Sequence, residues 1–97
     1  MTIQQVRKDL RSIRYYYSKQ KDFETAARTV GMNEIAETAE RYNAAVRKAP
    51  IRLYDVYVSL YIHNNTQLVL SFDWDCTAEY IRRLNKQLCE FLQKQLT

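Results

Sequence analysis

The sequence predicts an all-α fold, and the observations behind this prediction are its scarcity of turn residues and its hydrophobic spacing. The chain has 97 residues but only one Gly and one Pro, whereas multi-stranded sandwiches and barrels need a turn signal about every 8 to 12 residues. A second independent core is excluded at this length. We therefore expect a single domain over residues 1–97, with an N-terminal helical part over 1–49 packed against a second part over 51–97.

The first helix is predicted from apolar residues that recur at alternating spacings of three and four, which places them on one helical stripe. The stripe breaks at Gln20, so the helix either bends near residues 18–21 or changes its packing partner there. Its members are Ile3, Val6, Leu10, Ile13 and Tyr17 before the break, and Phe23, Ala27 and Val30 after it.

A second helix is predicted after Gly31, a residue suited to the left-handed turn that ends many helices. Apolar residues again repeat at spacings of four and three, and Pro50 is expected to end the helix because proline is tolerated only at a helix start. The repeating residues are Ile35, Ala39, Tyr42, Val46 and Ala49.

Residues 51–75 fit two different periods. As strands, two alternating runs on either side of a turn at 63–66 form a β-hairpin over 54–74. In the helical alternative, a first helix with one apolar face ends at Asn64 and Asn65, and Thr66 caps a second, short helix. Because Val, Tyr, Ile and Phe are enriched in strands, the pattern alone slightly favours the hairpin and an α+β fold. The helical alternative uses Leu53, Tyr57, Leu60 and Tyr61 in its first face and Leu70 and Trp74 in the short helix.

The last helix is amphipathic and long. Thr77 is a natural N-cap, and Glu79 in the first turn suits the positive end of the helix dipole. One face is apolar and the opposite face is charged, as in a helix that packs on a core. The apolar face contains Tyr80, Ile81, Leu84, Leu88, Phe91, Leu92 and Leu96.

The second half of the chain also carries a series with helix-turn-helix spacing. A helix ending in Tyr61-Ile62 is followed by Thr66 as a cap, the apolar and small pair Leu70-Ser71, Trp74, and Thr77 as the cap of the next helix. In this series, residues 53–96 resemble the C-terminal half of phage late-gene transcription regulators of the ArpU and RinA kind, themselves similar to region 4 of sigma factors. The resemblance implies an all-α fold, which we therefore prefer to the hairpin, and transcriptional control by binding double-stranded DNA.

In such a motif the recognition helix, here 77–95, reads base edges with the outward side chains of its first turns. Arg82 or Arg83 is expected to contact guanine with two hydrogen bonds, and Glu79 to accept one from cytosine. Asn85 could contact adenine only if its orientation permits. The predicted DNA-binding residues are Ala78, Glu79, Arg82, Arg83, Asn85 and Lys86.

The charge excess lies at the N-terminus. The chain carries 15 Lys and Arg against 11 Asp and Glu, a net charge of +4 with a pI near 9.2. Residues 1–30 alone contain seven basic and three acidic residues, so they hold the whole excess. Phosphate neutralisation supplies most non-specific duplex affinity. We therefore expect an auxiliary basic surface formed by Arg7, Lys8, Arg11 and Arg14, which either flanks DNA or binds an acidic protein surface.

Enzyme chemistry finds no support in the sequence. With one His, no Ser/His/Asp series, no glycine-rich phosphate loop and no metal-ligand cluster, we expect no catalysis, metal, cofactor or small-molecule substrate. No apolar window suggests a signal peptide or a membrane span, so a cytoplasmic location is expected. Cys76 and Cys89, if both lie on one helix, would be roughly 20 Å apart and could not form a disulfide.

The alternative function is a small helical adaptor or inhibitor that binds protein without binding DNA. Eight tyrosines and one tryptophan suit such a surface, because aromatic side chains are enriched at interface cores. The expected exposed anchors are Tyr15, Tyr16 and Phe72. RNA polymerase or another protein is the partner expected for such a surface. A homodimer fits either function, and helix-turn-helix proteins usually read paired half-sites.

Overall fold

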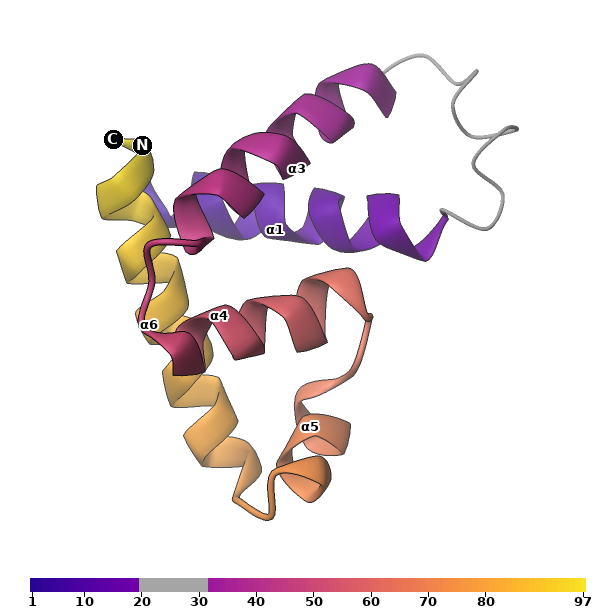
Figure 1. Ribbon diagram of the computed structural model, residues 1–97, viewed down its shortest axis with the longest axis vertical. Coiled ribbons are helices and arrows are strands. Elements are labelled where there is room, and N and C mark those ends of the chain that lie inside the picture. The colour runs from indigo at the N-terminus through magenta and orange to yellow at the C-terminus, as the bar shows by residue number, and fades with distance from the viewer. Residues whose placement is uncertain (20–31) are drawn as a thin grey trace.

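The computed structural model describes residues 1–19 and 32–97, and every regular element within these ranges is helical (Figure 1). The all-α prediction is confirmed, and the hairpin over 54–74 is wrong. The elements are α1 (Ile3–Ser18), α3 (Met32–Val46), α4 (Ile51–Tyr57), the π-helical turn η2 (Val58–Ile62), α5 (Gln67–Asp73) and α6 (Ala78–Leu96). The expected second stripe of Phe23, Ala27 and Val30, and the turn at Gly31, lie outside the described residues.

The segment that fitted two periods is helical because its buried residues follow a helical stripe. A strand would bury every second residue, but Leu53, Val56, Tyr57 and Leu60 are the buried ones. η2 continues α4 without a break, since Val58 keeps right-handed helical dihedral angles. α4 packs against α6, and η2 packs against α1. Burial by two neighbouring helices outweighs the strand preference of the β-branched and aromatic residues, which is a weak preference.

Pro50 acts at the start of a helix. α3 ends at Val46, three residues earlier than the spacing predicted, and Pro50 is the N-cap of α4. Its carbonyl accepts hydrogen bonds from the backbone N–H groups of Leu53 and Tyr54, at 3.0 and 3.1 Å. Proline lacks an N–H, and a helix does not use that group at its first positions. Pro50 therefore begins α4, and Ala49 belongs to the connection.

Threonine caps start α5 and α6, as predicted. The hydroxyl of Thr66 accepts from the Val69 N–H and that of Thr77 from the Tyr80 N–H, each at 3.1 Å. Between the caps, the chain turns without a glycine, and Asp75 takes the left-handed conformation at φ 50°. The Cys76 N–H donates to the Ser71 carbonyl at 2.9 Å, which closes α5 with a Schellman motif. Asp tolerates this backbone conformation better than most residues.

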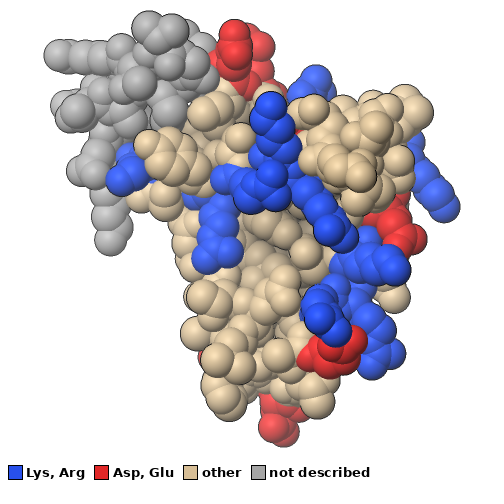
Figure 2. All heavy atoms as spheres, turned by 180° about the vertical axis from the view of Figure 1, so that it is seen from behind, with Lys and Arg blue, Asp and Glu red and all other residues tan. Residues whose placement is uncertain are grey.

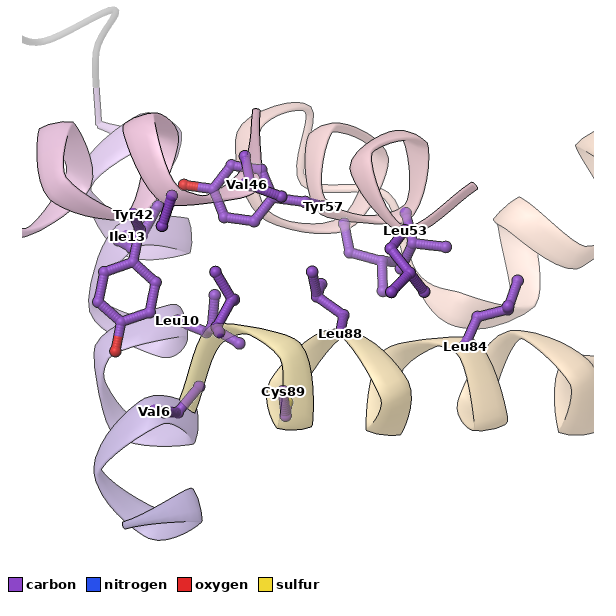
Figure 3. Packing of buried hydrophobic residues seen from close by; sticks show 14 of the residues in the cluster. Val6, Leu10, Ile13, Tyr42, Val46, Leu53, Tyr57, Leu84, Leu88 and Cys89 are labelled. Carbon is purple, nitrogen blue, oxygen red and sulfur yellow. The ribbon is translucent and has the colours of Figure 1, made fainter. Parts of the chain in front are cut away.

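One cluster of buried side chains joins the helices (Figure 3). Figure 3 shows Leu84 and Leu88 pointing from α6 into this cluster, with Leu53 and Tyr57 of α4 beside them. α1, α3 and α4 lie roughly side by side, and α6 runs across one end of all three (Figure 1). The chain termini meet at the far end of α6, where the Gln93 side-chain amide donates to the Met1 carbonyl at 3.1 Å. α1 packs on α6 toward that end, whereas the first turns of α6 lie beside α5 (Figure 1).

Buried tyrosine hydroxyls are paired with polar groups on neighbouring helices. Tyr42 of α3 donates to the Asp9 carboxylate of α1 at 2.7 Å. Tyr57 of α4 donates to the side-chain Oδ1 of Asn43 at 2.5 Å, and Nδ2 of Asn43 in turn donates to the Tyr17 hydroxyl at 2.9 Å. Pairing of this kind removes the cost of burying a hydroxyl without a partner. These bonds fix the position of α3 relative to α1 and α4.

Candidate nucleic-acid interface

A cationic groove lies between α1 and α6. Its volume is about 620 Å³, and most of its lining comes from these two helices. Tyr61 of η2 and Gln67 at the start of α5 complete it. α1 contributes Arg7 and Arg11, and α6 contributes Glu79, Arg82, Arg83, Asn85 and Lys86. Residues about 70 positions apart in sequence therefore line one surface.

The helical spacing explains why the cations converge. Arg7 and Arg11 are four residues apart on α1, as are Arg82 and Lys86 on α6, so each pair shares a helix face. Val6 and Leu10, the residues before each α1 arginine, are buried against the body of the fold. α1 packs on α6, so these two cationic faces border the same groove. Figure 2 shows Lys and Arg side chains gathered in a band over this side of the molecule.

The groove carries five cations and one carboxylate. Arg82 and Glu79 form an ion pair, and no other ion pair is found among residues 1–19 and 32–97. Both side chains are exposed, Arg82 to 70% and Glu79 to 54%. An exposed pair of this kind contributes only about 0 to 1 kcal/mol, because water screens it. Arg82 can thus exchange Glu79 for an incoming anion at little cost.

Asn85 is held by a hydrogen bond across the groove. The Tyr61 hydroxyl donates to Oδ1 of Asn85 at 2.5 Å. Burial raises the pKa of the Tyr61 phenol above its ordinary value, so it remains protonated and keeps donating. The two groups connect η2 to α6. Tyr61 is not predictable from sequence as a groove residue, because only the contact between these elements brings its hydroxyl to the groove.

The other residues of the predicted basic surface on α1 are used differently. Arg14 donates to the backbone carbonyl of Asn64 at 3.3 Å, which attaches α1 to the end of η2. Arg14 also lines a second hollow of about 410 Å³, with Arg11, Tyr15 and Asn64. Arg11 borders both hollows, so the cationic surface continues along α1. Lys8 is exposed but lines neither hollow, and on α6 the same holds for Ala78.

The three expected aromatic anchors differ in exposure. Tyr15 is 54% exposed and has the Lys19 ammonium 5.9 Å from the centre of its ring. Phe72 is 75% exposed on α5. The expectation of exposure is wrong for Tyr16, which is half-buried against the core and meets Tyr17 edge to face, with ring centres 5.2 Å apart. Tyr16 lies three residues after the buried Ile13, so the two share one face of α1 and Tyr16 is partly covered.

Residues 1–19 and 32–97 were also compared with the requirements of metal sites, membrane-spanning helices and disulfides. They hold no group of three or more His, Cys, Asp or Glu side chains that could bind a metal ion. Across the same residues, no helix has the length and apolarity that a membrane crossing requires. Cys76 and Cys89 are both free thiols, Cys76 in the turn before α6 and Cys89 in the core. Burial raises the pKa of the Cys89 thiol, although the neighbouring Arg7 opposes this shift.

The groove residues come from segments far apart in sequence, and the α1 residues lie outside the segment that carries the family resemblance. No protein-family model matches the chain, and comparisons with curated proteins and with solved structures give no match.

Proposed function

We propose that this chain binds double-stranded DNA through a helix-turn-helix formed by α5, its turn and α6, and that it acts as a transcriptional regulator of the phage-related type. α6 enters the major groove as the recognition helix, and the arginines of α1 contact backbone phosphates beside it. The observation that carries the proposal is the convergence of five cations from these two helices in one groove. Phosphate neutralisation provides most of the affinity of such an interface, and base contacts provide its specificity.

The charge arrangement supports DNA over a small anion as the ligand. Arg7, Arg11, Arg82, Arg83 and Lys86 are all exposed on a continuous surface rather than enclosed in a pocket. The second hollow extends this surface along α1 past Arg11. From residue 7 to residue 14, α1 rises about 10 Å. A polyanion with regularly spaced phosphates can contact an extended surface of this length, while a single phosphate would occupy only one part of it.

The proposal is tested by fluorescence anisotropy of a labelled duplex of random sequence, titrated at several salt concentrations. Wild type is expected to bind, with an affinity that falls steeply as salt rises. The variant Arg82→Ala/Arg83→Ala/Lys86→Ala should bind more weakly and with a smaller salt dependence, because three cations of the groove are lost. Absence of wild-type binding even at low salt would contradict DNA binding.

A second candidate function, protein binding, is favoured by the outer face of α5. Leu68, Val69 and Phe72 are 58%, 45% and 75% exposed, whereas Leu70 and Ser71 of the same helix are buried. Three large apolar side chains on one solvent-facing helix are unusual for a soluble surface. The exposed Asp73 and Asp75 follow the patch. We propose as its occupant a helical segment of another protein, with apolar residues flanked by Lys or Arg.

Three side chains alone do not supply the surface of a stable homodimer, which needs about 800 Å² and about 20 to 30 residues on each partner. Selection of helical peptides from a display library should enrich sequences that combine apolar and basic residues. Their affinity should fall at least tenfold for the variant Leu68→Gln/Phe72→Gln, because the apolar contacts are lost. Equal binding to the variant would exclude this surface, and a concentration-dependent dimer that the variant abolishes would identify a second copy as its occupant.

A further inference from the structure

Glu79 places a negative charge inside the cationic groove. Among the described residues that line the groove, it is the only one with a carboxylate. Glu79 lies three residues before Arg82 on α6 and forms an ion pair with it. Both side chains are more than half exposed and both line the groove. A ligand that occupies this part of the groove therefore meets the two opposite charges together.

We propose that Glu79 is a specificity-determining residue, whose negative charge weakens contact with backbone phosphates and favours base edges that carry an amino group. This inference rests on the proposed DNA binding and goes beyond it. A phosphate offers acceptors and a negative charge, so the attraction of Arg82 for it is opposed by repulsion from Glu79. In the major groove, adenine and cytosine each present an amino donor, which a carboxylate attracts.

The sign of the Glu79 charge, rather than the orientation of its two oxygens, sets this preference. A carboxylate has about four lone-pair sites, so Glu79 can accept from Arg82 and from a base at the same time. The exposed ion pair also opens at little cost, but opening it leaves the carboxylate beside any phosphate that Arg82 contacts. A phosphate therefore meets a net charge near zero at this point, whereas the amino group of a base meets an acceptor.

The test compares wild type and Glu79→Gln on two duplexes, one of random sequence and one that wild type selects from a random pool. Glu79→Gln should bind the random duplex roughly fivefold more tightly at 0.1 M salt, and its salt slope should steepen by up to about 0.9, because one charge that opposes phosphate is lost. Its affinity for the selected duplex should change by about twofold at most, because the lost contact with an amino group offsets this gain. The ratio of selected to random affinity should therefore fall.

Glu40→Gln is the matched control. It makes the same change of charge on α3, where Glu40 is exposed and does not line the groove. Its salt slope and its affinity ratio should equal those of wild type. A measurement on wild type alone keeps the inference testable if Glu79→Gln does not fold. Replacing adenine by purine, or cytosine by pyrimidin-2-one, removes the amino group of the base and should weaken binding at one or more positions of the selected duplex.

The outcomes separate the two proposals. If wild type binds no duplex at low salt, both DNA binding and the role of Glu79 are wrong. If wild type binds duplex but selects no sequence, or loses no affinity when amino groups are removed, the role of Glu79 is wrong and DNA binding stands. The same conclusion follows if Glu79→Gln tightens binding to both duplexes equally, since Glu79 would then only lower the net charge. A ratio that falls in Glu79→Gln but not in Glu40→Gln supports the inference.

Discussion

Substitution of four groove cations, in the variant Arg7→Ala/Arg11→Ala/Arg83→Ala/Lys86→Ala, is expected to lower the affinity for duplex DNA on the order of 10³-fold at 0.1 M salt. Each phosphate contact contributes about 0.9 to the slope of log affinity against log salt, so the slope should decrease by roughly 3 to 4. All four side chains are exposed, and alanine favours helix. The variant should therefore keep the fold while it loses the binding.

The contributions of α1 and α6 to DNA affinity can be separated by a double variant on each helix. Arg7→Ala/Arg11→Ala and Arg83→Ala/Lys86→Ala should each lower the slope by about half of the decrease expected for the fourfold variant, since each removes two of its four cations. The α1 pair should weaken all sequences equally, because phosphate contacts carry no base information. The α6 pair should also relax base preference. Equal salt slopes in wild type and the α1 pair would show that α1 lies outside the DNA interface.

A control variant that removes the same number of positive charges outside the groove separates the effect of the groove from that of net charge. Arg41, Arg47, Lys48 and Lys94 are exposed and do not line the groove. Substitution of these four by alanine also removes four positive charges from the net charge of +4. This variant should retain nearly all the affinity of wild type. A loss as large as that of the groove variant would mean that overall charge, rather than the groove between α1 and α6, governs binding.

Local signals were sufficient to predict the helix starts in the second half of the chain. Thr66 and Thr77 are followed three residues later by the N–H groups that they accept from, and this bond requires no distant contact. The end of α3 and the role of Pro50 are harder to predict from local sequence. The apolar spacing continues to Ala49, but a proline that begins one helix can look in sequence like one that ends another.

The choice between hairpin and helix required tertiary information. Residues 54–74 are rich in side chains that suit strands, and only their burial between α1 and α6 selects the helical stripe. Family resemblance led to the correct class where the pattern alone led to the wrong one. The exposed Leu68, Val69 and Phe72 show why the pattern misled, since a helix seldom presents three large apolar side chains to water.

The sequence predicts two separate sets of candidate residues, one on the first helix and one on the last, but not that they line one groove. Helical spacing places Arg82, Arg83 and Lys86 on the outside of the last helix, and the charge count identifies the basic segment on α1. Their union depends on the packing of α1 against α6, which the sequence does not specify. Two further contacts between residues far apart in sequence are equally unpredictable. Tyr61 bonds to Asn85, and Arg14 donates to the backbone carbonyl of Asn64.

Raising the pH above 10 is expected to unfold this domain steeply, because Tyr42 and Tyr57 are buried as neutral phenols. Neither side chain has any exposed surface. Burial raises the pKa of both phenols above the ordinary value of about 10, and for Tyr42 the hydrogen bond to the Asp9 carboxylate raises it further. In the unfolded chain both phenols ionise near pH 10. Between that pH and the higher folded pKa values, the folded state holds more protons, so stability falls as pH rises.

The magnitude follows from the two protons. Each costs about 1.4 kcal/mol of unfolding free energy per pH unit, which gives about 2.7 kcal/mol per unit for the pair. The Tyr61 phenol, whose pKa burial also raises, adds to this slope. Below pH 10 the stabilisation is fully present. A domain with about 5 kcal/mol of stability would therefore reach its unfolding midpoint roughly two pH units above 10. Circular dichroism at increasing pH, with denaturant titrations at each step, measures both the midpoint and the slope.

Tyr42→Phe/Tyr57→Phe should lower the slope of stability against pH by most of this amount, although loss of two hydrogen bonds makes it less stable at neutral pH, by about 1 kcal/mol each. Tyr15→Phe should keep the wild-type slope, because Tyr15 is 54% exposed and therefore lies outside the buried pair. Tyrosinate absorbance gives an independent readout. If all eight tyrosines ionise near pH 10 while helicity persists, the two phenols are accessible to solvent and the hydrogen bonds that join α3 to α1 and α4 do not persist in solution.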